Sequence, residues 1–333
     1  MNIKLTTPSR LHFGLIDLNG ELGRINGSFG VALENPHWII EGYKNKKINQ
    51  EIPLEIEYFN EIDKIKAKFQ DHFDCDSSKI NFQIKEKIPP HIGLGSKTQF
   101  SLAIAAILMK YHNLSLTTNE LAMLIQRGGT SGIGVAAFDA GGIILDGGHS
   151  FGPDKETKEF LPSSISKASP PPVIFRNYPP DNWRFVVITP AKIQGSFGLE
   201  EVNLFQTECP IPSGQVEKIS RLILMKILPA LVEKDIKTFG EGISDMQLQF
   251  NRFGFEKYSN TIVEELLDYM QKLKEIYGFG ISSFGPTIYA LTNSEIEANK
   301  IITEIKDNFS KDSFIYLANS KVNSSGVKID LTH

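Results

Sequence analysis

The most constraining feature of the sequence is the segment Pro89–Thr98 (PPHIGLGSKT), which leads into an apolar run from Phe100 to Met109. The run is apolar nearly all round, which predicts a buried helix beginning near Ser96. Two glycines allow the backbone to approach a ligand closely, and the first turn of a helix offers free N–H groups and a positive dipole end. The spacing is not that of a Walker A loop. The segment still predicts a phosphate or anion site at Gly93, Gly95, Ser96, Lys97 and Thr98.

Charge limits the kind of partner. The chain has 333 residues, with 35 basic and 39 acidic side chains and a net charge of −4. This balance gives no global positive field, so nucleic acid and anionic membranes are not expected as partners. Only Cys75 and Cys209 are present, without metal-ligand spacing, and the N-terminus has no apolar signal segment. We therefore expect a soluble, cytoplasmic protein whose positive charge for any anionic ligand is gathered locally.

The element pattern indicates an α+β protein, and the length suggests two domains. Helices are expected from Thr117, which begins a capping box, and over 216–232, 235–250 and from Ser259 to Gly278, with another opened by Ser294. A proline-rich passage at 163–181 separates the two proposed domains, 1–175 and 176–333. The expected strands are 2–6, 10–18, 28–34, 37–43, 53–59, 79–86, 142–146, 173–175, 184–189, 286–292, 313–317 and 326–330.

Three further clusters could carry chemistry. On a strand, Arg10 and His12 share one face, which either lines a site or forms a solvated outer surface. Asp146, at the end of a buried strand with His149 nearby, is either an acid–base or metal-binding group or a turn aspartate. The glycine-dense segment 127–134 predicts tight turns, and 278–287 (GFGISSFGPT) predicts a small-residue loop that enters a strand.

Together these segments resemble the GHMP superfamily of small-molecule kinases. The three motifs are TPSRLHFG, PHIGLGSKT and GISSFGPT, in the superfamily's order and spread over nearly the whole chain. The resemblance implies a GHMP kinase-like two-domain fold, with an N-terminal domain like ribosomal protein S5 domain 2 and a ferredoxin-like α/β sandwich at the C-terminus. TPSRLHFGLIDLNG, GLGSKTQ, RGGTSGIGVAAFDAGGIILDGG and SSFGPT resemble one branch, the β-ribofuranosylaminobenzene 5′-phosphate synthases.

The resemblance to this branch implies a phosphoribosyltransferase of tetrahydromethanopterin biosynthesis. Such an enzyme joins phosphoribosyl pyrophosphate to 4-aminobenzoate or 4-hydroxybenzoate, releases CO2 and pyrophosphate, and works with Mg2+ as a homodimer. Two departures from the kinase pattern favour the branch. Gly134 stands where many kinases have the Asp of S-G-x-D, and Arg10 replaces their usual lysine. Lys97, by contrast, departs from the small residue expected after GLGS in the synthases.

The resemblance also suggests roles for individual residues. Catalytic candidates are Arg10, His12, Asp17 and Asp146, with Arg10, His12 and Arg24 supplying positive charge or holding a carboxylate. Which residue binds a metal is left open. The expected substrate- or phosphate-binding residues are Ser9, Arg24, Gly93, Gly95, Ser96, Lys97, Thr98, Arg127, Ser131, Gly132, Ser282, Ser283 and Gly285, and Gln247 and Gln249 are candidates to face the cleft.

Two other functions remain open at this point. One is an ATP-dependent small-molecule kinase that uses the glycine-rich segment for ATP; the other is a non-catalytic binding protein with the same fold. The retained charged side chains of the first motif argue against the second alternative. The residues do not choose between the amino and the hydroxy acceptor, because a single polar contact can decide it.

Overall fold

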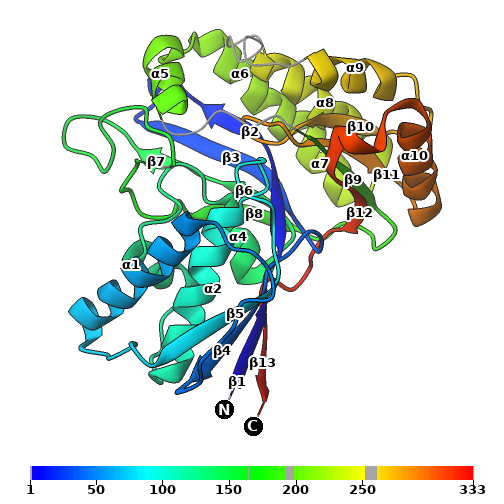
Figure 1. The fold of residues 1–333 in the computed structure, drawn as a ribbon. Coiled ribbons are helices and arrows are strands. Elements are labelled where there is room, and N and C mark those ends of the chain that lie inside the picture. Colours follow the sequence, from blue (N-terminus) through cyan, green and yellow to red (C-terminus); the bar gives the residue numbers. More distant parts are fainter. Residues whose placement is uncertain (1, 164, 192–198, 252–260, 333) are drawn as a thin grey trace.

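The computed structural model describes residues 2–163, 165–191, 199–251 and 261–332. One sheet brings the two ends of the chain together, and Figure 1 shows both termini side by side at its edge. Its order is β13-β1-β4-β5, all antiparallel, with Asn2 opposite Thr332. The last strand thus pairs with the first, whereas the sequence places 176–333 in a separate domain; the boundary at residue 175 stays a prediction. The strands are β1 (Asn2–Thr6), β4 (Ile39–Lys44), β5 (Ile80–Glu86) and β13 (Lys328–Thr332).

A second sheet lies at the centre of the molecule. Its order is β2-β3-β6-β8, with β7 paired to β3. The helices α1 to α4 pack beside these two sheets (Figure 1). The strands are β2 (Ser9–Asp17), β3 (Arg24–Leu33), β6 (Ile143–Asp146), β7 (His149–Ser150) and β8 (Val173–Asn177), and the helices are α1 (Ile56–Phe73), α2 (Ser96–Tyr111), α3 (Thr118–Leu124) and α4 (Ile133–Ala140).

The third sheet, with order β10-β11-β9-β12, is also antiparallel and is packed with the C-terminal helices. Its strands are β9 (Arg184–Pro190), β10 (Gly278–Ile281), β11 (Ile288–Thr292) and β12 (Phe314–Lys321). The helices are α5 (Leu199–Glu208), α6 (Ser213–Leu222), the π-helical Ile223–Ile227, α7 (Leu228–Glu233), α8 (Ile236–Asn251), α9 (Thr261–Met270) and α10 (Glu295–Asn308), followed by a 3-10 turn, Lys311–Ser313.

Buried aromatic rings join the central sheet to the third sheet. Phe13 of β2 lies 5.3 Å from Phe29 of β3 and 5.1 Å from Tyr289 of β11, between ring centroids. Phe185 of β9 closes the group, 6.1 Å from Phe13. Such large apolar rings dominate core energetics, so this contact keeps the two halves in a fixed arrangement.

Most expected elements are present, two expectations are wrong, and one helix was not expected. Residues 53–59 are not a strand, because α1 begins at Ile56 and buries Tyr58, Ile62, Ile65 and Phe69 at helical spacing. The glycine turn after Arg127 leads into α4, which was not expected because its eight residues are few and glycines flank them. Gly278 opens strand β10 rather than ending a helix, and α9 ends at Met270. The expected cap Ser259 lies outside the described residues.

Candidate functional site

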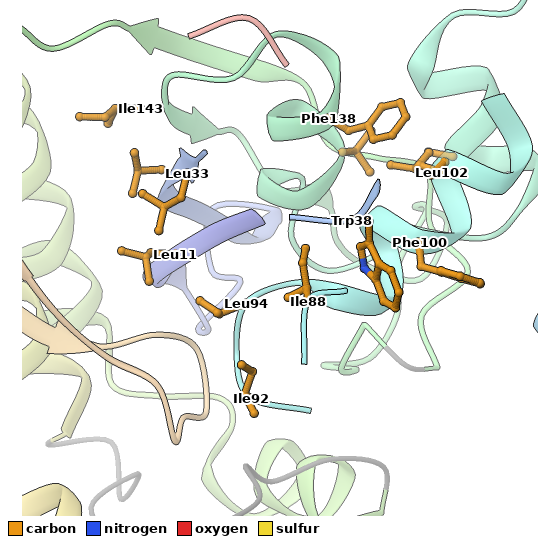
Figure 2. Packing of buried hydrophobic residues seen from close by; sticks show 14 of the residues in the cluster. Leu11, Leu33, Trp38, Ile88, Ile92, Leu94, Phe100, Leu102, Phe138 and Ile143 are labelled. Atoms are coloured by element: carbon orange, nitrogen blue, oxygen red, sulfur yellow. The ribbon is translucent and has the colours of Figure 1, made fainter. Parts of the chain in front are cut away.

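The glycine-rich segment is anchored by its apolar side chains. Ile88, Ile92 and Leu94 are buried, and Figure 2 shows them with Trp38 and Phe100 of the same hydrophobic cluster. The Trp38 and Phe100 rings lie 5.0 Å apart, and Trp38 Nε1 donates to the carbonyl of Ser96, 3.1 Å away. Because these side chains point inward, the backbone of the segment is held in place beside the cavity described below.

Two glycines give the segment its shape. Gly93 and Gly95 have φ of +85° and +74°, in the left-handed region that other residues rarely adopt. A Cβ at Gly93 would lie 2.5 Å from the carbonyl oxygen of Ser282, and one at Gly95 would lie 3.1 Å from Cγ of Arg10. The segment therefore contacts β2 and the 278–287 segment through bare backbone.

The first turn of α2 is open to an anion. Gly95 is its N-cap, without a side-chain cap, and the first turn contains no acidic residue. The first N–H groups of a helix lack intrahelical partners and lie at the positive end of the helix dipole. The Ser96 hydroxyl, however, donates to the Ile88 carbonyl at 2.7 Å and lies 2.9 Å from the Tyr58 hydroxyl. Any anion at this turn would thus meet backbone N–H groups, with Lys97 and Thr98, rather than the Ser96 hydroxyl.

A cavity of about 480 Å³ opens at this turn. Among the described residues, its lining carries three cationic side chains, Arg10, Lys97 and Arg127, against one carboxylate, Glu57. That carboxylate lies 2.8 Å from His91 Nε2 and 3.7 Å from Lys97 Nζ. The lining residues are Arg10, Glu57, Tyr58, His91, Ile92, Gly93, Leu94, Gly95, Ser96, Lys97, Thr98, Arg127, Gly128, Ser131, Gly134, Ser163, Ser283, Phe284 and Gly285. The local concentration of positive charge expected from the net charge is found here.

Arg10 ties the first motif to the second. Its Nη1 donates to the Gly93 carbonyl and its backbone N–H to the Leu94 carbonyl at 3.2 Å. The side chain thus lies along the glycine-rich segment and lines the cavity, as its place on one face of β2 suggests.

His12 does not carry the positive charge that the sequence suggested for it. The residue is only 6% exposed, and Nδ1 has no hydrogen-bond partner among the described residues. Burial, with the Arg10 cation beside it, lowers the pKa of His12 to about 3. His12 is therefore neutral at physiological pH, and it does not line the cavity.

The 278–287 segment closes the cavity from the C-terminal half. Ser282 Oγ donates to the Gly93 carbonyl at 2.6 Å and accepts the His12 backbone N–H at 3.0 Å. The Ser283 N–H donates to the His12 carbonyl at 2.9 Å. Ser283 and Gly285 line the cavity, whereas the Ser282 hydroxyl is used to bind the three motifs together.

Asp146 binds backbone N–H groups around the start of α4. Its carboxylate accepts the N–H groups of Ser28, Gly132 and Gly148 at 3.1, 2.9 and 3.0 Å, and also the Ser28 hydroxyl. Ser28 Oγ in turn accepts the Ser131 hydroxyl at 2.7 Å. Burial raises the pKa of Asp146 to about 6, although its hydrogen bonds act in the opposite direction. Asp146 and Gly132 lie outside the cavity lining, where Ser131 and Gly134 are found. Asp146 is thus placed to position this wall.

This raised pKa predicts a pH-dependent stability. Between pH about 4 and 6 the folded protein keeps a proton that the unfolded chain has released, so the contribution of Asp146 is fully present below pH about 4 and is lost as the pH rises through 6. Asp146→Asn does not titrate there. Urea unfolding is expected to show the stability difference, wild type minus variant, falling by about 2 kcal/mol from pH 4 to 7. A difference that stays constant with pH would contradict this prediction.

Several predicted residues lie elsewhere. Asp17 Oδ1 accepts the N–H groups of Asn19 and Gly20 at 2.8 and 3.0 Å, so its side chain stabilises a turn. Arg24 donates to the carbonyls of Gly147 and Gly148 at 2.9 and 2.7 Å. Neither side chain lines the cavity, and neither does buried Ser9. Gln247 accepts the Ile281 N–H at 2.9 Å, and Gln249 lines a different depression.

The structure also adds residues that the sequence did not indicate. Glu57 and Tyr58 reach the cavity from α1, and Ser163 and Phe284 come from loops. A usable signal existed for α1, since Tyr58, Ile62, Ile65 and Phe69 repeat at the i, i+3/i+4 spacing of an amphipathic helix. Among the described residues, no group of three or more His, Cys, Asp or Glu is placed to hold a metal ion, and no helix is long and apolar enough to cross a membrane.

Comparison with known proteins gives the class that this fold and site define. Residues 60–142 match the GHMP kinases N terminal domain and residues 227–311 the GHMP kinases C terminal domain. Mevalonate diphosphate decarboxylase from Staphylococcus aureus has the same fold, with a TM-score of 0.69 at 14% identity, covering 99% of this chain and 98% of that one. The expected GHMP kinase-like α+β fold is confirmed.

Relatives with similar sequences identify a narrower family than the fold does. The chain is 41% identical to β-ribofuranosylphenol 5′-phosphate synthase from Methanothermobacter thermautotrophicus, over 87% of this chain and 89% of the relative. It is 40% identical to the Archaeoglobus fulgidus protein of the same name, over 99% and 100%. The chain belongs to the β-ribofuranosylphenol 5′-phosphate synthase family. It is therefore an enzyme, a pentosyltransferase of the C-riboside synthase type, as the motif resemblance implied.

Proposed function

We propose that the enzyme condenses phosphoribosyl pyrophosphate with 4-hydroxybenzoate or 4-aminobenzoate, releasing CO2 and pyrophosphate. The observation that carries the proposal is the roughly 40% identity with named synthases over nearly the whole chain. The cavity supports it, because three cations and an uncapped helix terminus suit a substrate that carries phosphate groups. A β-ribofuranosyl arene 5′-phosphate remains as the product, for use in tetrahydromethanopterin biosynthesis.

The bond changes balance without a further reactant. The bond from the anomeric carbon to pyrophosphate breaks with its electron pair leaving on pyrophosphate, and oxocarbenium character develops on the ribose. The ring carbon that bears the carboxylate forms the new C–C bond, helped by electron density from the para substituent. The C–CO2 bond then breaks, and its electron pair restores the aromatic ring. The protein's task is to hold both anions and stabilise the departing charge. The position of Arg10, Lys97 and the first turn of α2 around one cavity supports this role for them.

The packing at Gly134 supports a synthase over a kinase. A Cβ at Gly134 would lie 3.2 Å from Cγ2 of Thr98, and the Gly134 carbonyl accepts Gln99 Nε2 at 2.7 Å. A carboxylate side chain at this kinase position would therefore press against Thr98, which would have to shift slightly. The group that would orient or deprotonate an alcohol substrate is absent at the position where the kinase pattern has it.

Mg2+ is part of the proposal as a companion of pyrophosphate. Mg2+ commonly binds one or two carboxylates together with substrate phosphates. The described lining offers one carboxylate, Glu57, which fits this mode and not a cage made of protein alone. When bound, the ion would neutralise charge on the leaving group.

We also propose that the enzyme is cytoplasmic and forms a homodimer. Size-exclusion chromatography with light scattering tests the oligomeric state.

Carboxyl-labelled substrate tests the reaction. With phosphoribosyl pyrophosphate, Mg2+ and labelled 4-hydroxybenzoate or 4-aminobenzoate, and without ATP, we expect equal amounts of CO2 and pyrophosphate. Chelation of Mg2+ should slow the reaction. If the protein consumes ATP with a small alcohol and releases no CO2, the kinase alternative replaces this proposal.

A further inference from the structure

A buried ion pair stands behind the cavity wall. Arg127, just after α3, donates from Nη2 to Glu61 Oε1 of α1 at 2.7 Å. Ser101 of α2 donates its hydroxyl to the same carboxylate oxygen, also at 2.7 Å. The Glu61 side chain is only 8% exposed and the Arg127 side chain 15%. One carboxylate thus joins three segments that surround the cavity.

Arg127 contacts Glu61 with one edge of its guanidinium and also lines the cavity. Its Nε is buried and has no hydrogen-bond partner among the described residues. Because Nε is enclosed, an anion in the cavity would meet the other N–H groups of the guanidinium, which has five donors in all. Planar guanidinium groups suit phosphate oxygens in particular.

The Glu61 side chain is negatively charged at neutral pH. Burial by itself would raise the pKa of Glu61, but the Arg127 cation and the Ser101 hydroxyl outweigh it, so the pKa lies below its usual value. Glu61 is therefore ionised, and a buried carboxylate paired in this way restrains the guanidinium strongly.

We propose that Glu61 is a positioning residue, whose carboxylate holds the Arg127 guanidinium so that its remaining N–H groups bind a phosphate group of the pyrophosphate moiety. Arg127 shares the cavity with Lys97 and the open first turn of α2, which places the group beside the other anion-binding elements. This inference rests on the proposed function for its substrate. The binding of inorganic pyrophosphate can nevertheless be measured without turnover.

The test compares Glu61→Gln with the wild-type chain. The amide keeps the shape and one acceptor but loses the charge. We expect pyrophosphate affinity, measured by calorimetry, to fall about 10-fold, as should the apparent affinity (1/KM) for phosphoribosyl pyrophosphate. The KM of the aromatic acid should stay within about twofold of wild type. Arg127→Lys is a second variant that leaves Glu61 paired with a cation but removes the planar set of guanidinium donors, and it should give a similar loss.

Two matched comparisons separate positioning from a structural role. Ser101→Ala removes the other hydrogen bond to Glu61 and leaves the ion pair, so it should leave pyrophosphate affinity within about twofold of wild type. In an Arg127→Ala background, Glu61→Gln should have no further effect on pyrophosphate binding. The proposal is overturned if Glu61→Gln weakens aromatic acid and pyrophosphate equally, if its effect persists without Arg127, or if the wild-type chain binds no pyrophosphate. Absence of CO2 release with intact pyrophosphate binding would instead overturn the proposed function alone.

Discussion

Replacing Arg10 with alanine is expected to lower kcat/KM by about 100-fold or more, because loss of one preorganised donor at a developing negative charge commonly costs that much. Arg10 lines the cavity, lies against Gly95 and donates to the Gly93 carbonyl. The variant thus loses a cation of the site and a support of the glycine-rich segment. Steady-state kinetics with both substrates, together with thermal unfolding, measure the effect.

Arg24→Ala is the matched control for this variant. Arg24 also donates to backbone carbonyls in a glycine-rich loop, but its side chain lies outside the cavity lining. We expect a modest loss of stability and a much smaller kinetic effect. If Arg10→Ala leaves turnover and both substrate affinities unchanged, its assignment to the site is wrong.

The second large effect is expected at Gly93. A methyl group at this position meets the Ser282 carbonyl at 2.5 Å and the Gly285 carbonyl at 3.1 Å, and the residue has φ of +85°. Gly93→Ala should therefore destabilise the protein by about 3 kcal/mol through left-handed strain and steric overlap together. It should also nearly abolish activity, because the overlap separates the two segments that form the cavity. Urea unfolding and kinetics measure both effects.

Gly23→Ala isolates the steric part of this effect. Gly23 has a comparable φ of +77°, but a Cβ there meets nothing within 4 Å. Its cost should be about 1–2 kcal/mol, from backbone strain alone, with normal activity. Equal losses in the two variants would show that the contact between Gly93 and the 278–287 segment is unimportant.

Local patterns predicted the parts of the site that depend on nearby residues. The glycine-rich segment, helix α2 and the Thr117 capping box are confirmed because glycine conformation, apolar content and capping act over a few residues. The alternation of Ile52, Leu54 and Ile56 imitated a strand, although the next two turns are clearly helical. Helix α4 gave no periodic signal because almost every residue in it is buried.

The roles of individual polar residues were much less predictable. Asp17 and Arg24 lie in or beside glycine-rich motifs, as Arg10 does, yet their side chains bind backbone groups outside the cavity. His12 has the residue type of an acid–base group, but burial next to Arg10 keeps it neutral. The neutral state of His12 depends on desolvation, which no short pattern contains. The partners of Arg24 lie more than a hundred residues away in the chain, whereas Asp17 stabilises a local turn.

The sequence by itself determined the family, the GHMP kinase-like fold and the position of the glycine-rich segment, because all three depend on motif order and local conformation. Only the tertiary structure decided which charges meet in one cavity. It brought Glu61 to Arg127 and Ser282 to Gly93, and it paired the last strand with the first. Charge interactions and hydrogen bonds depend on distance and burial, and both are set when segments far apart in the chain pack together.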